Sequence, residues 1–189
     1  MKIYLASKSP RRHQLLKQIG IEFEIVDVNI DEHWDGIENV RHYVERMSLE
    51  KARDGKIKLN SNKNIAVLGA DTAVVLDDQI MGKAQNDEDA RQMLKSLSGR
   101  MHHVYSAITL ITDTEEKTKT NISRVSFRPL TDHEIEIYCK TGEPLGKAGA
   151  YAIQGRAAAF IERLEGSYSG VMGLPLYETT ELLKSAEIV

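Results

Sequence analysis

A serine-rich segment that ends in two arginines is the first group of residues in this sequence that could do chemistry. Ser7, Ser9, Arg11 and Arg12 follow a short apolar run, and Arg11 and Arg12 fall in the first turn of a predicted helix. Cations at a helix N-terminus are mildly unfavourable, by about 0.3–1 kcal/mol each, and a bound anion reverses that sign. Free backbone N–H groups, hydroxyls and guanidinium forks together favour a phosphate cradle. The alternative is a pair of solvated surface charges.

A second candidate is the acid that follows the apolar run 65–70. Asp71, followed by Thr72, comes where that run stops, and a carboxylate at the end of a strand lies where open α/β sheets bind ligands. It could coordinate a divalent cation or accept a proton from an attacking water. The alternative is an aspartate that forms a turn.

Three further charged residues are informative only in combination. Lys51 continues the apolar stripe of a predicted helix, Lys83 ends the predicted strand Ile80–Lys83, and Glu32 belongs to an acidic loop. Each has a simpler interpretation, because lysines commonly extend their ammonium into water and loop acids are usually solvated. Glu32 and Asp71 together could hold Mg²⁺, which uses one or two carboxylates plus substrate phosphates.

The glycine-rich segment 149–155 contains an amide that could recognise a base. Gln154 offers a donor and an acceptor, which match the adjacent N–H and C=O of uracil or thymine. A purely structural loop is the alternative. Trp34 could stack on a base or could pack between lobes.

The pattern of the chain predicts the elements that position these residues. Strands are expected at Ile3–Ala6, Phe23–Val28, Ile65–Ala70 and Ala73–Leu76, with an antiparallel pair at His102–Thr112 and Lys117–Phe127 and a hairpin at Phe160–Leu164 and Tyr168–Val171. Helices are expected from Pro10 to Gly20, around Val40–Lys51, after Asn86, from Thr131 to about Lys140, and from Pro175. Residues 60–64 are predicted to be a surface linker. This order favours an α/β fold with a central mixed β-sheet flanked by helices, in a single domain over 1–189, with two lobes and a cleft.

Composition excludes several classes of protein. The chain has 189 residues with 25 basic and 28 acidic side chains and a net charge of −3, which disfavours capture of DNA, RNA or an anionic membrane. No run approaches the ~18 residues of a membrane span, and we expect a cytoplasmic protein. The lone Cys139 provides neither a disulfide nor a metal cluster. No Walker A, dinucleotide-binding or zinc-protease motif occurs.

Taken together, these segments resemble the Maf family of nucleoside triphosphate pyrophosphatases, in particular its dTTP/UTP-hydrolysing subfamily. The resemblance runs along almost the whole chain and is carried by these motifs: Leu5-Ala6-Ser7-x-Ser9-Pro10-Arg11-Arg12, Lys51-Ala52, Leu68-Gly69-Ala70-Asp71-Thr72, Gly82-Lys83, Leu97-Ser98-Gly99, Glu143-Pro144, Lys147-Ala148-Gly149-Ala150-Tyr151 and Gly173-Leu174-Pro175. It implies a homodimer with a fold like that of inosine triphosphate pyrophosphatase. It also implies cytoplasmic hydrolysis of a nucleoside triphosphate to the monophosphate and pyrophosphate, with Mg²⁺, Mn²⁺ or Co²⁺.

The resemblance also assigns roles. Asp71 matches the family's proposed proton acceptor, and Arg11, Thr72 and Gln154 match its substrate-specificity positions. Other positions that line the family's pocket are matched by Arg12, Glu32, Lys51 and Lys83. Gly146, Ala152 and Ala84 stand where Asp, Gly and Pro are usual, which concerns the geometry of loops rather than the reaction.

Two other functions are consistent with parts of the sequence. Family members are associated with inhibition of cell division, so a nucleotide-binding regulator of septum formation that does not hydrolyse its ligand is one alternative. Modified pyrimidine nucleotides, removed in nucleotide-pool sanitation, are an alternative substrate.

Overall fold

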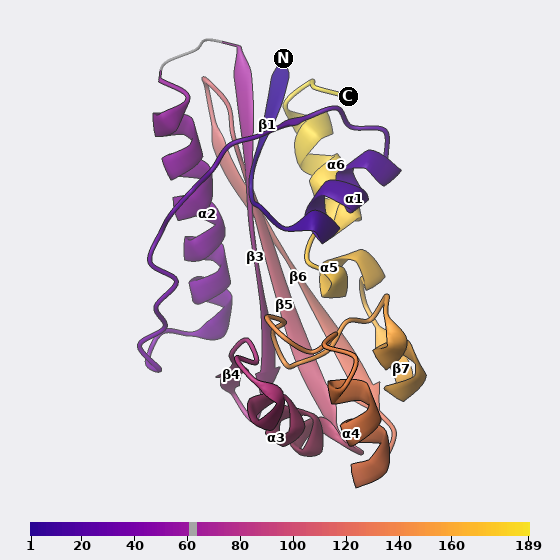
Figure 1. Ribbon diagram of the computed structural model, residues 1–189. Coiled ribbons are helices and arrows are strands. Elements are labelled where there is room, and N and C mark those ends of the chain that lie inside the picture. Colours follow the sequence, from indigo (N-terminus) through magenta and orange to yellow (C-terminus); the bar gives the residue numbers. More distant parts are fainter. Residues whose placement is uncertain (61–63) are drawn as a thin grey trace.

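The computed structural model describes residues 1–60 and 64–189, which form a mixed sheet with helices on both faces (Figure 1). Six of the seven strands are ordered β2-β1-β3-β5-β6-β7, and β4 pairs with β3 off this path. The strands are β1 (Lys2–Ala6), β2 (Glu24–Ile25), β3 (Ile65–Leu76), β4 (Gln79–Met81), β5 (Met101–Ile111), β6 (Glu116–Phe127) and β7 (Ile161–Glu165). The predicted α/β class and mixed sheet are confirmed.

Helices cover the two faces of the sheet unequally. The helices are α1 (Pro10–Gln18), α2 (Val40–Lys58), α3 (Asp87–Leu97), α4 (Asp132–Cys139), α5 (Tyr168–Met172) and α6 (Leu176–Ser185), with a 3-10 helix at Arg156–Phe160. In Figure 1, the long α2 runs along one side of the sheet, while α1, α5 and α6 lie on the other side. No helix among residues 1–60 and 64–189 is long and apolar enough to cross a membrane.

Alternation along β3 directs successive side chains to these two faces. Ala66, Leu68 and Val74 belong to the large apolar core on the side of α1 and α5, whereas Val67 and Ala73 pack toward α2. Since neighbouring side chains of a strand point in opposite directions, Asp71 faces α2 and Thr72 faces α5.

One edge of β3 is interrupted where these two residues lie. The parallel partner β1 ends at Ala6, opposite Gly69, and the antiparallel β4 begins its pairing at Val74. Within the described residues, positions 70–73 therefore have no strand partner on this edge. On the other edge β3 stays paired with β5 from Val67 to Val75, with Asp71 opposite Ala107 and Thr72 opposite Ser106.

This register corrects the expectation that the strand stops at Asp71. The ladder with β5 continues through positions 71 and 72, so Asp71 lies inside a strand of 12 residues. The apolar run ends there because the carboxylate faces a polar cavity and not because the backbone turns.

Two other predicted elements also differ from the structure. The second strand is only Glu24–Ile25 instead of Phe23–Val28. The hairpin predicted at Phe160–Leu164 and Tyr168–Val171 is wrong, because β7 pairs with β6 and residues Tyr168–Met172 form α5. The Ser167 side chain caps α5 by accepting a hydrogen bond from Gly170 N at 2.9 Å.

The other predicted elements agree with the structure to within a few residues, except that α2 continues past Lys51 to Lys58. The antiparallel pair β5 and β6 is confirmed, as are the Asn86 cap of α3 and the Thr131 capping box of α4. The surface linker predicted over 60–64 includes residues 61–63, which lie outside the described residues.

Gly69 sets how closely α2 approaches the sheet. A Cβ built on Gly69 would lie 2.1 Å from Ser48 O and 2.7 Å from Ala52 N, both backbone atoms of α2. We expect Gly69→Ala to push α2 away and to lower the free energy of unfolding by about 3 kcal/mol or more, the upper range for overpacking. Urea denaturation followed by circular dichroism measures this.

Gly82→Ala is the matched control for this substitution. A Cβ on Gly82 would meet nothing within 4 Å, so its urea midpoint is expected to stay near that of the wild type. Equal midpoints for both variants would contradict the close approach of α2.

Candidate active site

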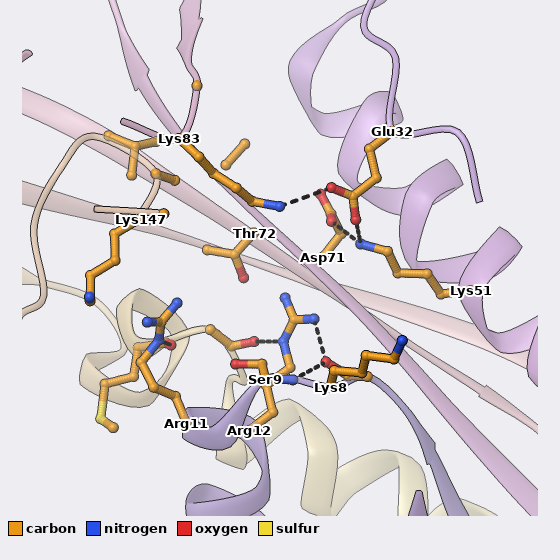
Figure 2. Close-up of a pocket in the computed structure, with 18 of the residues that line it drawn as sticks. Lys8, Ser9, Arg11, Arg12, Glu32, Lys51, Asp71, Thr72, Lys83 and Lys147 are labelled. Atoms are coloured by element: carbon orange, nitrogen blue, oxygen red, sulfur yellow. Dashed lines mark hydrogen bonds and ion pairs between the residues drawn. The ribbon is translucent and has the colours of Figure 1, made fainter. Parts of the chain in front are cut away.

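A cavity of about 1060 Å³ opens at the interrupted edge of β3. It is enclosed by the β1–α1 loop, the 28–34 loop, the end of β4 and the segments 146–154 and 171–173. All ten residues singled out from the sequence line it: Ser7, Ser9, Arg11, Arg12, Glu32, Lys51, Asp71, Thr72, Lys83 and Gln154. Figure 2 shows that most of them point toward one another across the cavity.

Lys51 joins two carboxylates at the wall formed by α2. Its Nζ lies 2.7 Å from Asp71 Oδ1 and 2.6 Å from Glu32 Oε1 (Figure 2). The side chains of Lys51 and Asp71 are only 9% and 11% exposed, so Lys51 does not extend into solvent as an isolated surface lysine would. The close approach at Gly69 brings α2 near enough for this pair to form.

Glu32 continues the network to the opposite wall. Its second oxygen, Oε2, lies 3.1 Å from Lys83 Nζ, and its backbone carbonyl accepts a hydrogen bond from Tyr43 Oη at 3.0 Å. Partial burial would raise the pKa of Glu32, but the hydrogen bond and charge of Lys51, followed by those of Lys83, outweigh burial and lower the pKa to about 2. The ion pairs of Glu32 with Lys51 and Lys83 therefore hold the acidic loop at the cavity.

The two arginines are held by the carbonyl end of α5. Arg11 Nε donates to Met172 O at 3.2 Å, and Arg12 Nε donates to Gly173 O at 2.8 Å. Unpaired carbonyls at the end of a helix carry partial negative charge, which offsets the unfavourable position of both cations at the start of α1. Burial lowers the pKa of both guanidiniums, and for Arg12 the charge of Asp71 opposes this shift.

Ser7 and Ser9 differ in what they do. Ser9 occupies the N-cap position of α1, but its side chain makes no capping hydrogen bond. Instead, Ser7 Oγ accepts from Ser9 N at 3.2 Å and from Arg12 Nη1 at 3.1 Å. Ser7 therefore fixes the loop and one arginine, and the hydroxyl of Ser9 is not used for capping.

Thr72 and Gln154 face the cavity from two different elements. Thr72 Oγ1 lies 2.7 Å from Ser106 Oγ on β5. Gln154 lies in the irregular segment between α4 and the 3-10 helix, and it is exposed while Tyr151 and Ile153 beside it are buried. Trp34 donates from Nε1 to Glu38 O at 2.9 Å and packs against the apolar side of α2. It also lines the cavity, so its position is compatible with both interpretations.

The sequence analysis missed three contributors to this site. Lys147 lines the cavity and donates to Glu143 O; burial, followed by the charge of Arg11, lowers its pKa. The carbonyls of α5 were missed because residues 168–171 were predicted to form a strand of a hairpin. Ser106 had no signal in the sequence. Lys147 could have been found, because it stands in the run Lys147-Ala148-Gly149 that carries the family resemblance.

The cavity concentrates positive charge in a protein whose net charge is −3. Six cationic side chains line it (Lys8, Arg11, Arg12, Lys51, Lys83 and Lys147), against three carboxylates (Asp31, Glu32 and Asp71). Such an excess is suited to a polyanion, because a concave wall of one sign raises the local concentration of the opposite charge.

The same walls provide a small number of ligands for a metal. Among the described residues, no group of three or more His, Cys, Asp or Glu side chains could hold a metal ion. Glu32 and Asp71 nevertheless contact the same ammonium, so their oxygens lie close together. Two carboxylates fit Mg²⁺, provided that phosphate oxygens of a bound substrate complete the coordination.

Comparison with known proteins agrees with this combination of fold and site. The profile of the family described as Maf-like protein matches residues 2–186, and the chain belongs to this family. A dTTP/UTP pyrophosphatase of Aromatoleum aromaticum is 50% identical over 195 residues, which cover 97% of this chain and 95% of that protein. A dTTP/UTP pyrophosphatase of Alkalilimnicola ehrlichii is 50% identical over 189 residues, with 98% and 93% covered.

A solved structure resembles the fold. The Staphylococcus aureus Ham1 protein aligns with a TM-score of 0.53 over 98% of this chain and 100% of that chain, at 13% sequence identity. This likeness concerns the arrangement of the sheet and helices alone.

Replacing Lys51 tests how strongly the site is held together. Lys51→Met keeps the length of the side chain but leaves Asp71 buried without its counter-charge. We expect a loss of about 3 kcal/mol in the free energy of unfolding at pH 7, since removing one partner of a buried ion pair leaves an uncompensated charge. Urea denaturation measures it.

Arg53→Met on the same helix is the control. The Arg53–Glu116 pair is 55% and 42% exposed, and an exposed pair contributes less than about 1 kcal/mol. A loss for Lys51→Met no larger than that for Arg53→Met would show that the buried pair does not stabilise the site.

Proposed function

We propose that this protein hydrolyses dTTP and UTP to the monophosphate and pyrophosphate. The observation that carries the proposal is the buried Asp71 carboxylate, which lies on an open strand edge within a cavity lined by six cationic side chains. The relatives that are 50% identical over nearly the whole chain are named dTTP/UTP pyrophosphatases, which supports both the reaction and the pyrimidine substrates.

Charge is the basis of substrate binding in this proposal. Arg11, Arg12, Lys51 and Lys83 would bind the triphosphate and stabilise the negative charge that develops on the departing pyrophosphate. Lys147 would assist them from the neighbouring wall. Arg11 and Arg12 are pre-oriented by the carbonyls of α5, so little side-chain freedom is lost when phosphate binds.

Asp71 is the group we propose to act on water. Its Oδ1 accepts a hydrogen bond from Lys51 at 2.7 Å, and among the described residues its Oδ2 has no hydrogen bond. This second oxygen would orient a water toward the α-phosphorus and take its proton. The water oxygen then bonds to the α-phosphorus, while the bond from that phosphorus to the bridging oxygen breaks and pyrophosphate leaves.

A divalent cation is part of this proposal. Glu32 and Asp71 are the residues that would hold Mg²⁺, Mn²⁺ or Co²⁺ together with substrate phosphates. When bound, such an ion neutralises phosphate charge and polarises the bond under attack. Lys51 would then have to shift away from one of the carboxylates that it now contacts.

Base recognition is the second part of substrate binding in this proposal. Arg11, Thr72 and Gln154 are the proposed specificity residues, and the exposed amide of Gln154 can donate to a C=O on the Watson–Crick edge of uracil or thymine. Modified pyrimidines that keep this edge would be bound in the same way, which would suit a role in nucleotide-pool sanitation.

A regulator of septum formation that binds nucleotide without hydrolysis is the weaker alternative. Such a protein needs the cations but has no use for an acid next to phosphate, and the relatives are named as enzymes. The resemblance of the sequence to the Maf family is the basis on which we also propose a homodimer that acts in the cytoplasm.

The products and the origin of their oxygen test the reaction. With UTP, a divalent cation and water enriched in ¹⁸O, we expect UMP and pyrophosphate, with the label in UMP, because water attacks the α-phosphorus. Phosphorus NMR resolves both products, and a chelator should stop the reaction until Mg²⁺, Mn²⁺ or Co²⁺ is restored. Release of orthophosphate, or label in pyrophosphate, would show that a different bond is cut.

Asp71→Asn tests the proposed proton acceptor. The amide keeps the shape of the side chain but cannot take a proton, so we expect kcat to fall by about 10²–10⁴, the usual contribution of a general base. Steady-state assays of UTP with the cation present measure it. Asp78→Asn, on the exposed turn after the same strand, is the control and should retain wild-type turnover. Turnover of Asp71→Asn within threefold of the wild type would remove Asp71 from this role.

A further inference from the structure

A buried serine lies directly behind Thr72. Ser106 is 1% exposed and stands opposite Thr72 in the β3–β5 ladder, so both side chains lie on the same face of the sheet, toward α5. Ser106 Oγ is 2.6 Å from Gly170 O of α5 and 2.7 Å from Thr72 Oγ1. The three oxygens therefore form a chain from α5 to the cavity wall.

The direction of the hydrogen bonds in this chain is fixed by counting protons. A carbonyl oxygen only accepts, so the single hydroxyl proton of Ser106 must point at Gly170 O. If it pointed at Thr72 instead, two buried oxygens would face each other at 2.6 Å with no hydrogen between them, which is strongly unfavourable. Thr72 must therefore donate its own proton to Ser106.

This arrangement fixes the hydrogen-bonding role of the Thr72 hydroxyl. Its proton is directed away from the cavity, so the lone pairs that remain can only accept a hydrogen bond. Phosphate oxygens cannot be its partners, because they are acceptors as well. Sugar hydroxyls rotate and can donate or accept, so a fixed acceptor does not discriminate among them. Thr72 can therefore discriminate only between ligand groups that are permanently donors and groups that are permanently acceptors.

We propose that Ser106 is a specificity-determining positioning residue, which holds Thr72 as an acceptor for the N3–H of uracil or thymine and against cytosine. Cytosine carries a lone pair at N3, and this lone pair would face the lone pairs of Thr72. The inference rests on the proposed function, because it names the base edge that the same cavity selects. Ser106 acts through Thr72 and does not touch the substrate.

The ratio of kcat/KM for UTP to that for CTP measures this effect. In Ser106→Ala the hydroxyl of Thr72 is free to rotate and can donate to N3 of cytosine. We expect the UTP/CTP ratio to fall about tenfold, the scale of one hydrogen bond that is made or lost, with kcat for UTP within a few-fold of the wild type. Ser106→Cys, whose thiol is a poor donor and acceptor, is a second variant of similar volume and should change the ratio in the same direction.

Two controls separate orientation of Thr72 from a purely structural role. Ser123 is also 1% exposed, and it supports the start of α5 by accepting from Ser167 N at 2.9 Å, so Ser123→Ala should leave the UTP/CTP ratio unchanged. In a Thr72→Val background there is no hydroxyl to orient, and adding Ser106→Ala should then have no further effect on the ratio.

The outcomes distinguish the inference from the function on which it rests. An unchanged ratio in both Ser106 variants, or an equal fall in the Thr72→Val background, would overturn the inference and leave the hydrolysis of UTP intact. Wild-type protein that does not hydrolyse UTP would overturn the proposed function, and the inference with it. A fall in the ratio that depends on Thr72 supports both.

Discussion

The site depends on a strand that continues past its partner. Because β1 ends opposite Gly69 and β4 begins its pairing at Val74, β3 has an open edge at residues 70–73. Its other edge is held by the continuous ladder with β5. A paired strand is rigid, so the side chains at this opening have fixed directions. The carboxylate of Asp71 and the hydroxyl of Thr72 therefore reach one cavity from opposite faces of the sheet.

A helix on each face of the sheet holds charged and polar side chains of the cavity in place. On one side, the close approach of α2 at Gly69 delivers the Lys51 ammonium to Asp71 and Glu32. On the other side, the short helix α5 presents carbonyls to Arg11 and Arg12 and to the hydroxyl of Ser106. Cations that would repel one another are thereby held in fixed positions before any polyanion arrives. Electrostatic stabilisation of this kind is effective because the groups need little reorganisation during the reaction.

Much of the local structure could be predicted from the sequence. The capping residues Asn86 and Thr131 marked real helix starts, and the two long strands β5 and β6 pair as expected. Local signals failed where tertiary pairing decides. The apolar and small residues at 168–171 fit a strand as well as a helix, and only the pairing of β7 with β6 leaves them free to form α5. Ser106 had no local feature that distinguished it, whereas Lys147 stood in a run that the sequence analysis had already singled out.

The sequence by itself determined the types of the groups: paired arginines at a helix start, an acid inside an apolar run, and lysines at the edges of apolar stripes. These are properties of short segments, and periodicity and capping are visible in short segments. Only the tertiary structure decided that these groups share one cavity, that Lys51 joins Glu32 to Asp71, and that Thr72 is an acceptor. Lys51 is 20 positions from Asp71, Thr72 is 34 from Ser106, and Ser106 is 64 from Gly170. Such contacts arise from strand register and helix packing, which no local pattern encodes.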